Sequence, residues 1–193
     1  MKVLDLHIHT IYSDGVMGVR EAIKYAKKIG LRGISITDHD TLQGSLKALQ
    51  LAKELKLHDF IVIPGIEISC SYGHILVYGL INIRKYNSIL ELIDIVREED
   101  GVTVLAHPYG KLFLLPHKAT KSRDLLLRLD AIEVINGKTP PVSNRKAQDL
   151  SRKLHKPGIG GSDAHMLHEI GVARTIIENY HVSSINDVLK AIK

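Results

Sequence analysis

The chain has 193 residues, a formal net charge of +5, 45% hydrophobic residues and 24% charged residues. This length suits one domain with a substantial core, and the composition is that of an ordinary globular protein. No apolar run approaches the roughly 18 residues of a membrane helix, and the scattered lysines and arginines do not form a nucleic-acid footprint. The single cysteine, Cys70, excludes an internal disulfide framework, so we expect a cytoplasmic location.

The first predicted element is a short buried strand over residues 3–8, at the end of which stand two of the eleven histidines. Because strand side chains alternate, His7 and His9 point to the same face, where two neutral imidazoles can hold one divalent metal ion. Asp14 follows in a Ser-Asp-Gly turn that can bring its carboxylate back over the strand end. Taken alone, this opening also fits two core histidines and a turn aspartate.

Helical and β-rich segments are predicted to alternate along the rest of the chain. The expected helices cover residues 18–29, 41–55, 88–99, 122–129, 143–154 with Ser143 as its N-cap, and 183–192; the expected strands cover residues 31–37, 60–68, 73–80, 102–106, 131–135, 158–161 and 172–178. Residues 109–121 are predicted to be irregular, with an apolar patch at 112–115. The alternation predicts an α/β fold with a largely parallel sheet and about seven β–α units. Since a full eightfold barrel takes about 250 residues, we expect a single domain over residues 1–193 that forms a distorted, TIM-like barrel.

Residues of the types that bind metals fall mostly at the carboxyl ends of the predicted strands. They are His7, His9, Asp14, His39, Glu67, His74, His107, Asp163 and His165. In a parallel barrel the carboxyl ends of the strands share one rim, where active sites are built. Side chains scattered along the whole chain are therefore expected to meet in one pocket.

Six imidazoles and three carboxylates exceed the needs of a single catalytic zinc ion, which uses about three protein ligands. We therefore expect two or three divalent ions of zinc, manganese or iron, with a carboxylate such as Glu67 bridging a pair. Three such ions carry more positive charge than three carboxylates neutralise, which favours a bound hydroxide and an anionic substrate, phosphate above all. Clustered metal ions suit phosphoryl chemistry because they hold the attacking and leaving oxygens at once.

Five short motifs in sequence order together resemble a known family. They are His7-x-His9, Thr37-Asp38-His39-Asp40, Gly65-Ile66-Glu67, His107-Pro108 and Gly161-Ser162-Asp163-Ala164-His165, and their order and spacing are similar to those of the PHP (polymerase and histidinol phosphatase) superfamily from residue 5 to about residue 171. The resemblance implies a distorted (β/α)7 barrel with a trinuclear metal site. It implies one ion held by His7, His9, Glu67 and Asp163, a second by Glu67, His74 and His107, and a third by Asp14, His39 and His165.

Further polar residues flank these motifs. Asp38 or Asp40 can orient the imidazole of His39, or Asp40 can cap the following helix. Glu133 and Asn136 resemble the Glu-Val-x-Asn pattern of the superfamily, which implies that Asn136 faces the site and contacts substrate while Glu133 is structural.

Two cations and one more histidine are candidates for contacts with a substrate. Lys138 and Arg145 follow a strand that ends at the rim and could clamp a phosphate, although both could also be ordinary solvated charges. His168 could donate a proton to the leaving group or be a surface loop histidine. The remaining histidines have no partner pattern and are assigned structural roles: His58, His117, His155 and His181.

The predicted function is a stand-alone, metal-dependent hydrolase of phosphate esters, in which a metal-bound hydroxide attacks phosphorus in line. The resemblance favours nucleotides, short oligonucleotides or other small phosphodiesters as substrates, with Asp14, His39, His165 and His168 in catalytic roles. Three alternatives stay open at this point. They are a monoesterase of the histidinol phosphatase type, a low-turnover metal-binding accessory subunit of a nucleic-acid enzyme, and hydrolysis of a non-phosphate bond. No membrane partner is expected, and the sequence does not fix the oligomeric state.

Overall fold

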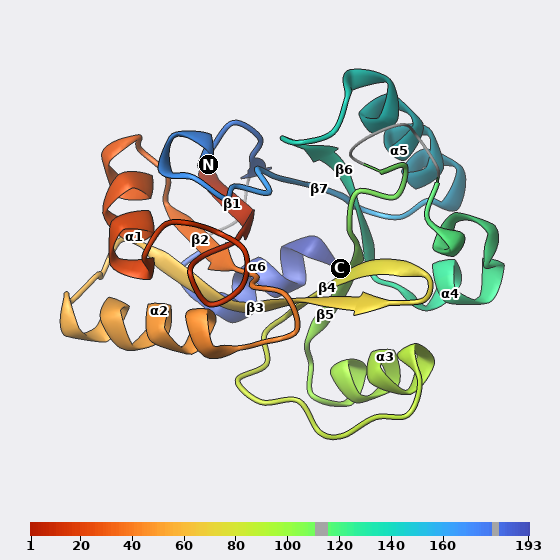
Figure 1. Cartoon of the computed structure of the whole chain (residues 1–193), viewed down its shortest axis with the longest axis horizontal. Coiled ribbons are helices and arrows are strands. Elements are labelled where there is room, and N and C mark those ends of the chain that lie inside the picture. The colour runs from red at the N-terminus through yellow and green to blue at the C-terminus, as the bar shows by residue number, and fades with distance from the viewer. Residues whose placement is uncertain (111–115, 179–181) are drawn as a thin grey trace.

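Helices and strands alternate along most of the chain, as the hydrophobic pattern predicts (Figure 1). The computed structural model describes residues 1–110, 116–178 and 182–193. The strands are β1 (Lys2–Ile8), β2 (Gly33–Ile36), β3 (Ile61–Cys70), β4 (Gly73–Tyr78), β5 (Val102–Leu105), β6 (Ala131–Asn136), β7 (Gly158–Gly161) and β8 (Thr175–Ile177). The α-helices are α1 (Val19–Lys28), α2 (Gln43–Glu54), α3 (Ile89–Glu98), α4 (Arg123–Arg128), α5 (Pro141–Leu154) and α6 (Ile185–Ile192).

The strands form one sheet that curls into a nearly closed barrel. Their order is β7-β6-β5-β4-β3-β2-β1-β8. A parallel bridge between Ile8 and Ala164 joins the end of β1 to the segment after β7, and this contact brings the two ends of the sheet together. The predicted distorted barrel is therefore confirmed.

The expectation of a largely parallel sheet needs a correction at β4 and β8. No helix separates β3 from β4, so β4 runs antiparallel to both β3 and β5, and β8 is antiparallel to β1. Antiparallel strands can be joined by a tight turn, whereas parallel ones need a long crossover. As a consequence, the first residues of β4, including His74, lie at the same rim as the carboxyl ends of the parallel strands.

A shift in the pairing of β1 allows both an apolar side chain, Leu6, and the imidazole of His7 to point into the barrel. The register of β1 against β2 shifts between Asp5 and Ile8. Within this stretch Leu6 packs in the interior, and the Nε2 atoms of His7 and His9 face one another at 3.1 Å. Strict alternation would send Leu6 and His7 to opposite faces, and an irregularity in the ladder removes that constraint.

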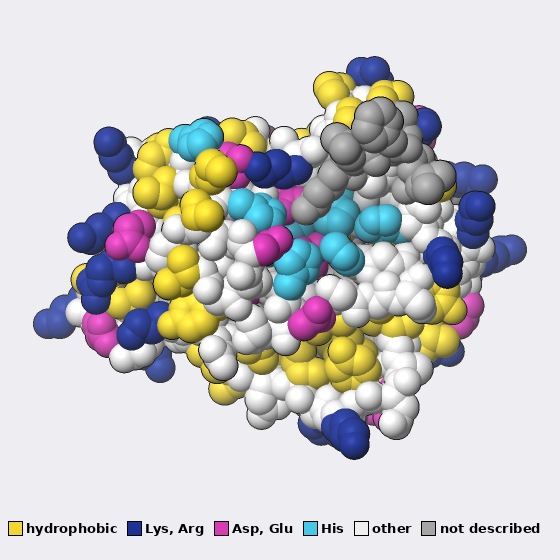
Figure 2. All heavy atoms as spheres, viewed as in Figure 1, with side chains coloured by type: hydrophobic (Ala, Val, Ile, Leu, Met, Phe, Trp, Pro, Cys, Tyr) yellow, Lys and Arg dark blue, Asp and Glu magenta, His cyan; other side chains and the backbone are white. Residues whose placement is uncertain are grey.

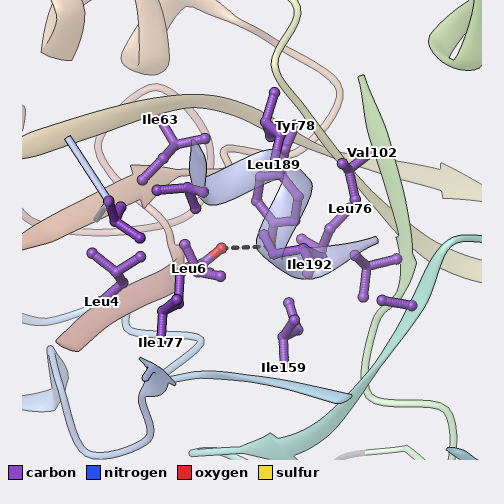
Figure 3. Packing of buried hydrophobic residues seen from close by; sticks show 14 of the residues in the cluster. Leu4, Leu6, Ile63, Leu76, Tyr78, Val102, Ile159, Ile177, Leu189 and Ile192 are labelled. Carbon is purple, nitrogen blue, oxygen red and sulfur yellow. Dashed lines mark hydrogen bonds between the residues drawn. The ribbon is translucent and has the colours of Figure 1, made fainter. Parts of the chain in front are cut away.

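The barrel interior is a continuous apolar core, and α6 contributes Val188, Leu189 and Ile192 to it (Figure 3). Its fully buried members include Leu4, Leu6, Ile63, Leu76, Tyr78, Val102 and Val104. The hydroxyl of Tyr78 donates a hydrogen bond of 2.7 Å to the carbonyl of Leu6, which joins β4 to β1 across this core. Further clusters pack α1 and α2 against β1 to β3, and α3 and α4 against β4 and β5.

Most predicted helix ends are close to the observed ones, with one exception. Ser88 and Ser184 accept hydrogen bonds from the backbone at the starts of α3 and α6. The prediction that Ser143 caps α5 is wrong, because α5 begins at Pro141, whose fixed φ suits the first helical turn. Ser143 is buried and donates to the carbonyl of Tyr109 at 3.4 Å.

In the described part of the segment predicted to be irregular, Lys118–Lys121 forms a short 3-10 helix. The predicted apolar patch at 112–115 lies outside the described residues. Within the described ranges, no helix combines the length and the apolar character that crossing a bilayer would require.

Candidate metal centre

The nine side chains predicted to bind metals meet at one rim of the barrel. Figure 2 shows histidines gathered around acidic side chains near the middle of this face. His9 Nε2 lies 3.4 Å from Asp163 Oδ1, and His107 Nε2 lies 4.0 Å from Asp163 Oδ2. Residues from β1, from the end of β5 and from the segment after β7 thus converge, as the strand-end pattern predicts.

Glu67 lies at the floor of the cluster, and each of its carboxylate oxygens faces a different group of imidazoles. Oε2 is 3.2 Å from His7 Nε2 and 3.1 Å from His9 Nε2. Oε1 is 3.0 Å from both His74 Nδ1 and His107 Nε2. The carboxylate is fully buried, so this one side chain connects two groups of potential ligands.

Asp14 lies at the mouth of the cluster, with a side chain that is 54% exposed. Its Oδ2 is 3.1 Å from His165 Nε2 and 3.7 Å from His39 Nε2, and its Oδ1 is 3.4 Å from His9 Nδ1. The solvent-facing part of the cluster is therefore the part made by Asp14, His39 and His165.

The backbone turns sharply where two of these side chains leave their strands. His107 follows β5 with φ of 26°, and Asp163 follows β7 with φ of 55°. Non-glycine residues rarely adopt positive φ, and such conformations cluster at functional sites because the surrounding structure must hold them. Gly161 is required next to this turn, since a Cβ there would lie 2.4 Å from the Cβ of His7.

The contacts of His7 and His165 show that the cluster suits cations. Nδ1 of His7 donates to Glu133 Oε1 at 2.8 Å, so Nε2 is the nitrogen left to bind a cation, and it lies 3.1 Å from His9 Nε2 and 3.2 Å from Glu67 Oε2. Nδ1 of His165 donates to the carbonyl of Asp163 at 2.8 Å, so Nε2 is again the nitrogen left for a cation, and it lies 3.1 Å from Asp14 Oδ2. Ligand atoms around one tetrahedral ion with bonds near 2.1 Å lie about 3.4 Å apart, and the spacings around His7 are close to this distance.

Four overlapping triads of the described residues bring their donor atoms within 4.8 Å of one another. They are His7, Glu67 and His107; His7, His9 and Asp163; His9, Asp14 and His39; and His39, Glu67 and His74. Imidazole nitrogen and carboxylate oxygen together suit zinc, manganese and iron. Eight of the nine predicted ligands belong to these triads, and His165 joins them through its contact of 3.1 Å with Asp14.

The electrostatics also favour positive charge in the cluster. Burial by itself opposes ionisation of Glu67, but charge on His7 and hydrogen bonds from His107 and other imidazoles outweigh it and hold the pKa of Glu67 well below its usual range. Burial opposes a charge on His7 too, yet the carboxylates of Glu133, Glu67 and Asp163 outweigh it and raise the pKa of His7 well above its usual value. The carboxylates thus stabilise cations at their centre, whether protons or metal ions.

Glu133 and Asn136 lie beneath the cluster and contact three of its members. Glu133 Oε2 accepts from the backbone N–H of His107 at 2.9 Å and from Asn136 Nδ2 at 3.0 Å, and Asn136 Nδ2 also donates to Asp163 Oδ2 at 3.1 Å. The side-chain oxygen of Asn136 accepts from Lys138 N and Thr139 Oγ1. Asn136 is 1% exposed, so its contacts favour a role in holding Asp163 rather than the predicted contact with substrate.

Asp38 and Asp40 support the loops around His39. Asp38 is buried, and its carboxylate accepts from the backbone and hydroxyl of Thr10 and from Ser13 Oγ, which fixes the loop that carries Asp14. Asp40 accepts from the backbone N–H of Ser69 at 2.8 Å, and the residue before α2 is Leu42. The alternative that Asp40 caps this helix is therefore wrong.

The predicted substrate contacts lie at the surface around the rim. Lys138 pairs with Glu169, whose other oxygen accepts from the backbone of His165 and Met166. Arg145 is exposed on α5, and His168 is exposed on a short 3-10 helix, Leu167–Glu169. The roles assigned to Lys138, Arg145 and His168 stay predictions.

His117 was assigned a structural role from the sequence, but it lies beside the cluster. Its ring centroid is 5.2 Å from that of His107 and 5.8 Å from that of His74. A backbone hydrogen bond of 2.9 Å from His117 to the carbonyl of Pro108 folds this segment back onto the rim. No strand or helix periodicity runs through this part of the chain, so the pattern gave no signal for it.

With this geometry in place, comparison with known families identifies the chain. Residues 5–133 match the PHP domain, and residues 141–193 match the PHP-associated family that accompanies it. The chain belongs to the PHP family. The matched PHP range contains seven of the nine candidate ligands, from His7 to His107, and the other two, Asp163 and His165, fall in the range of the PHP-associated family.

Individual relatives of this PHP domain agree with the assignment. An uncharacterized protein of Methanocaldococcus jannaschii is 36% identical over 146 residues, which cover 68% of this chain and 80% of that protein. A 5′-3′ exoribonuclease of Haemophilus influenzae is 37% identical over 71 residues, which cover 37% of this chain and 25% of that protein. A solved two-domain protein of Bacteroides vulgatus, described as containing a predicted PHP-like metal-dependent phosphoesterase, superposes with a TM-score of 0.72 at 19% identity and covers 87% of this chain and 53% of that chain. The last likeness concerns the fold.

Proposed function

We propose that this chain is a metal-dependent phosphoesterase that hydrolyses nucleotides, short oligonucleotides or other small phosphodiesters. The observation that carries the proposal is the position of Glu67, whose two oxygens face different groups of imidazoles on one floor. A carboxylate in this position suits two adjacent cations, and adjacent cations suit displacement at phosphorus. The partial match to an exoribonuclease supports a nucleotide-type substrate.

The donor set would hold two or three ions. The first would use His7, His9, Glu67 and Asp163, the second Glu67, His74 and His107, and the third Asp14, His39 and His165. When bound, divalent zinc, manganese or iron lowers the pKa of water and neutralises charge on phosphoryl oxygens. We propose a cytoplasmic enzyme formed by residues 1–193 as one domain.

The buried residues around Glu67 and the exposed residues around Asp14 would have different roles in the reaction. The buried floor around Glu67 excludes bulk water, which strengthens every electrostatic contact made there. Asp14, His39 and His165 face the solvent and would meet the incoming phosphoryl group. His168 would give a proton to the leaving group from the loop that follows His165.

Positive charges beyond the histidines would complete the contacts with substrate. Lys138 and Arg145 would bind phosphoryl oxygens outside the metal cluster, with Lys138 first releasing Glu169. Asn136 would act from below by holding Asp163. The net charge of +5 further favours anionic ligands.

The test is hydrolysis of p-nitrophenyl phosphate and bis-p-nitrophenyl phosphate by protein loaded with manganese, zinc or iron, alongside elemental analysis. We expect two or three ions per chain, hydrolysis of the diester, and competitive inhibition by inorganic phosphate. Hydrolysis of the monoester alone would instead favour the histidinol phosphatase type. Absence of hydrolysis with every metal would favour an accessory subunit, and turnover of other substrates without inhibition by phosphate would favour a non-phosphate bond.

A further inference from the structure

Exposed apolar side chains gather beside the metal centre, on the two loops that carry Asp14 and His165. We call this surface the apolar platform. Its members are Ile11, Tyr12, Val16 and Met166, whose exposed fractions are 62%, 38%, 70% and 45%. Figure 2 shows hydrophobic side chains on the same face as the histidines, on the side where the red and blue loops of Figure 1 lie.

The backbone joins the two loops next to the candidate ligands. The N–H of Val16 donates to the carbonyl of His165 at 2.9 Å, and Met166 directly follows His165. The N–H of Ile11 donates to the carbonyl of Met17 at 3.1 Å, which closes the first loop on itself. Each member of the platform therefore lies within three residues of Asp14 or His165.

The loop that carries most of the platform is held in one conformation. Asp38 Oδ1 accepts from Thr10 N at 2.6 Å and from Ser13 Oγ at 2.9 Å. At Gly15 a Cβ would lie 2.4 Å from the carbonyl oxygen of His9, so only glycine permits this close approach. The apolar side chains are thus presented to solvent by a fixed scaffold.

A single exposed apolar residue is ordinary, but a group of them at the mouth of a polar site marks a binding surface. We infer that the apolar platform binds the flat, apolar organic group of a phosphoester whose phosphoryl group lies at the metal centre. This inference rests on the proposed function. The ring of Tyr12 and the branched chains of Ile11 and Val16 favour an aromatic group over a small polar alcohol, because apart from the Tyr12 hydroxyl they offer apolar contact and no hydrogen bond.

The test compares two phosphonates that present the same charged head to the metals and differ only in the organic group. Isothermal titration of the manganese-loaded full chain is expected to give about tenfold tighter binding of phenylphosphonate than of methylphosphonate. The double variant Val16→Ser/Met166→Ser is expected to lose most of this preference while its affinity for methylphosphonate and its metal content stay unchanged. Both substituted side chains are exposed, so the fold does not depend on them.

The matched control is Ile81→Ser, which changes an equally exposed apolar residue, 61% accessible, in the loop at the other end of β4. It should bind both phosphonates as the parent does. The platform would be overturned if the parent bound both phosphonates equally or bound neither. It would also be overturned if the double variant lost affinity equally for both phosphonates, or if the control changed in the same way. Hydrolysis of p-nitrophenyl esters with equal phosphonate affinities would reject the platform alone. Selective phosphonate binding without turnover would reject the hydrolytic function alone.

Discussion

Glu133 Oε1 accepts a hydrogen bond of 2.8 Å from His7 Nδ1, and both side chains are fully buried. A buried carboxylate is costly unless it is paired and hydrogen-bonded, and here its other oxygen binds the backbone of His107 and the amide of Asn136. The contact fixes the tautomer of His7 and leaves its Nε2 lone pair for a cation. Carboxylates behind metal-binding histidines have this effect in general.

The variant Glu133→Gln is expected to weaken metal binding about 10- to 100-fold. The amide carries no charge, and its NH2 group would face one of the N–H donors that Glu133 now binds. The measurement is the manganese and zinc content after dialysis against graded chelator, together with the melting temperature of the metal-free protein. A structural role alone would lower the melting temperature without changing the relative affinity for metal.

The control is Glu98→Gln, on the exposed face of α3, where the glutamate pairs with Arg84. It is expected to bind metal like the parent, since surface ion pairs contribute little. If Glu133→Gln retained the parent's metal affinity, the role assigned to this carboxylate would be wrong.

Removal of the carboxylate at the mouth, Asp14→Ala, is expected to lower kcat about 100-fold while leaving the protein folded. Asp14 is half exposed and, among the described residues, contacts the cluster through His9, His39 and His165 at its surface, so the core does not rely on it. Turnover of p-nitrophenyl esters and thermal unfolding measure the two effects. Asp149→Ala on α5 is the control, and a rate for Asp14→Ala equal to the control's would contradict a catalytic role for the mouth.

Chelation is expected to lower the melting temperature, and added manganese is expected to restore it. An ion that binds only the folded chain stabilises it by about 2.7 kcal/mol at a concentration 100 times its Kd. Calorimetric scans with chelator, and then with manganese in excess of it, measure this effect. The melting temperature of His39→Ala should change less than that of the parent. If the melting temperature of the parent changed with neither addition, this would contradict metal binding at this rim.

The position of the cluster could be predicted from the sequence, because it depends on the alternation of side chains along a strand and on the place where each strand ends. His7 and His9 share a face by strand periodicity, and His107 and Asp163 follow apolar runs whose ends meet in any parallel barrel. His74 reaches the rim for a different reason, namely the reversal of β4, which the sequence did not predict.

Features that depend on tertiary contact escaped prediction. The pairing of Glu133 with His7 and the approach of His117 to His107 join segments with no shared periodicity. Asn136 ends β6 at the rim, and its hydrogen bonds to Glu133 and Asp163 had no signal in the sequence pattern. Such partners are set by packing of the whole barrel, which local patterns do not encode.

The variant Tyr78→Phe is expected to destabilise the fold by about 1–2 kcal/mol without changing metal content. The substitution removes only the hydroxyl that donates to the carbonyl of Leu6 at 2.7 Å, which leaves a buried acceptor without this partner. Urea unfolding measures the change. Tyr25→Phe on α1 is the matched control, and equal stability of Tyr78→Phe and the parent would show that the hydroxyl contributes nothing to closing the barrel.

Asp187 gives a prediction for acid conditions. Hydrogen bonds from the backbone of Ser183 and from the side chain and backbone of Ser184 lower the pKa of Asp187 to about 2. A carboxylate whose pKa is lowered on folding stabilises the folded state above its unfolded pKa of about 3.9, and this stabilisation is lost as the pH falls toward the folded value. Asp187→Asn should therefore have a lower melting temperature than the parent at pH 7. This difference in melting temperature should shrink as the pH falls from about 4 to about 2, between the unfolded and the folded pKa of Asp187. Thermal unfolding across this range, with Asp149→Asn as the exposed control, measures it, and a difference that does not vary with pH would contradict the role of the ionised carboxylate at the start of α6.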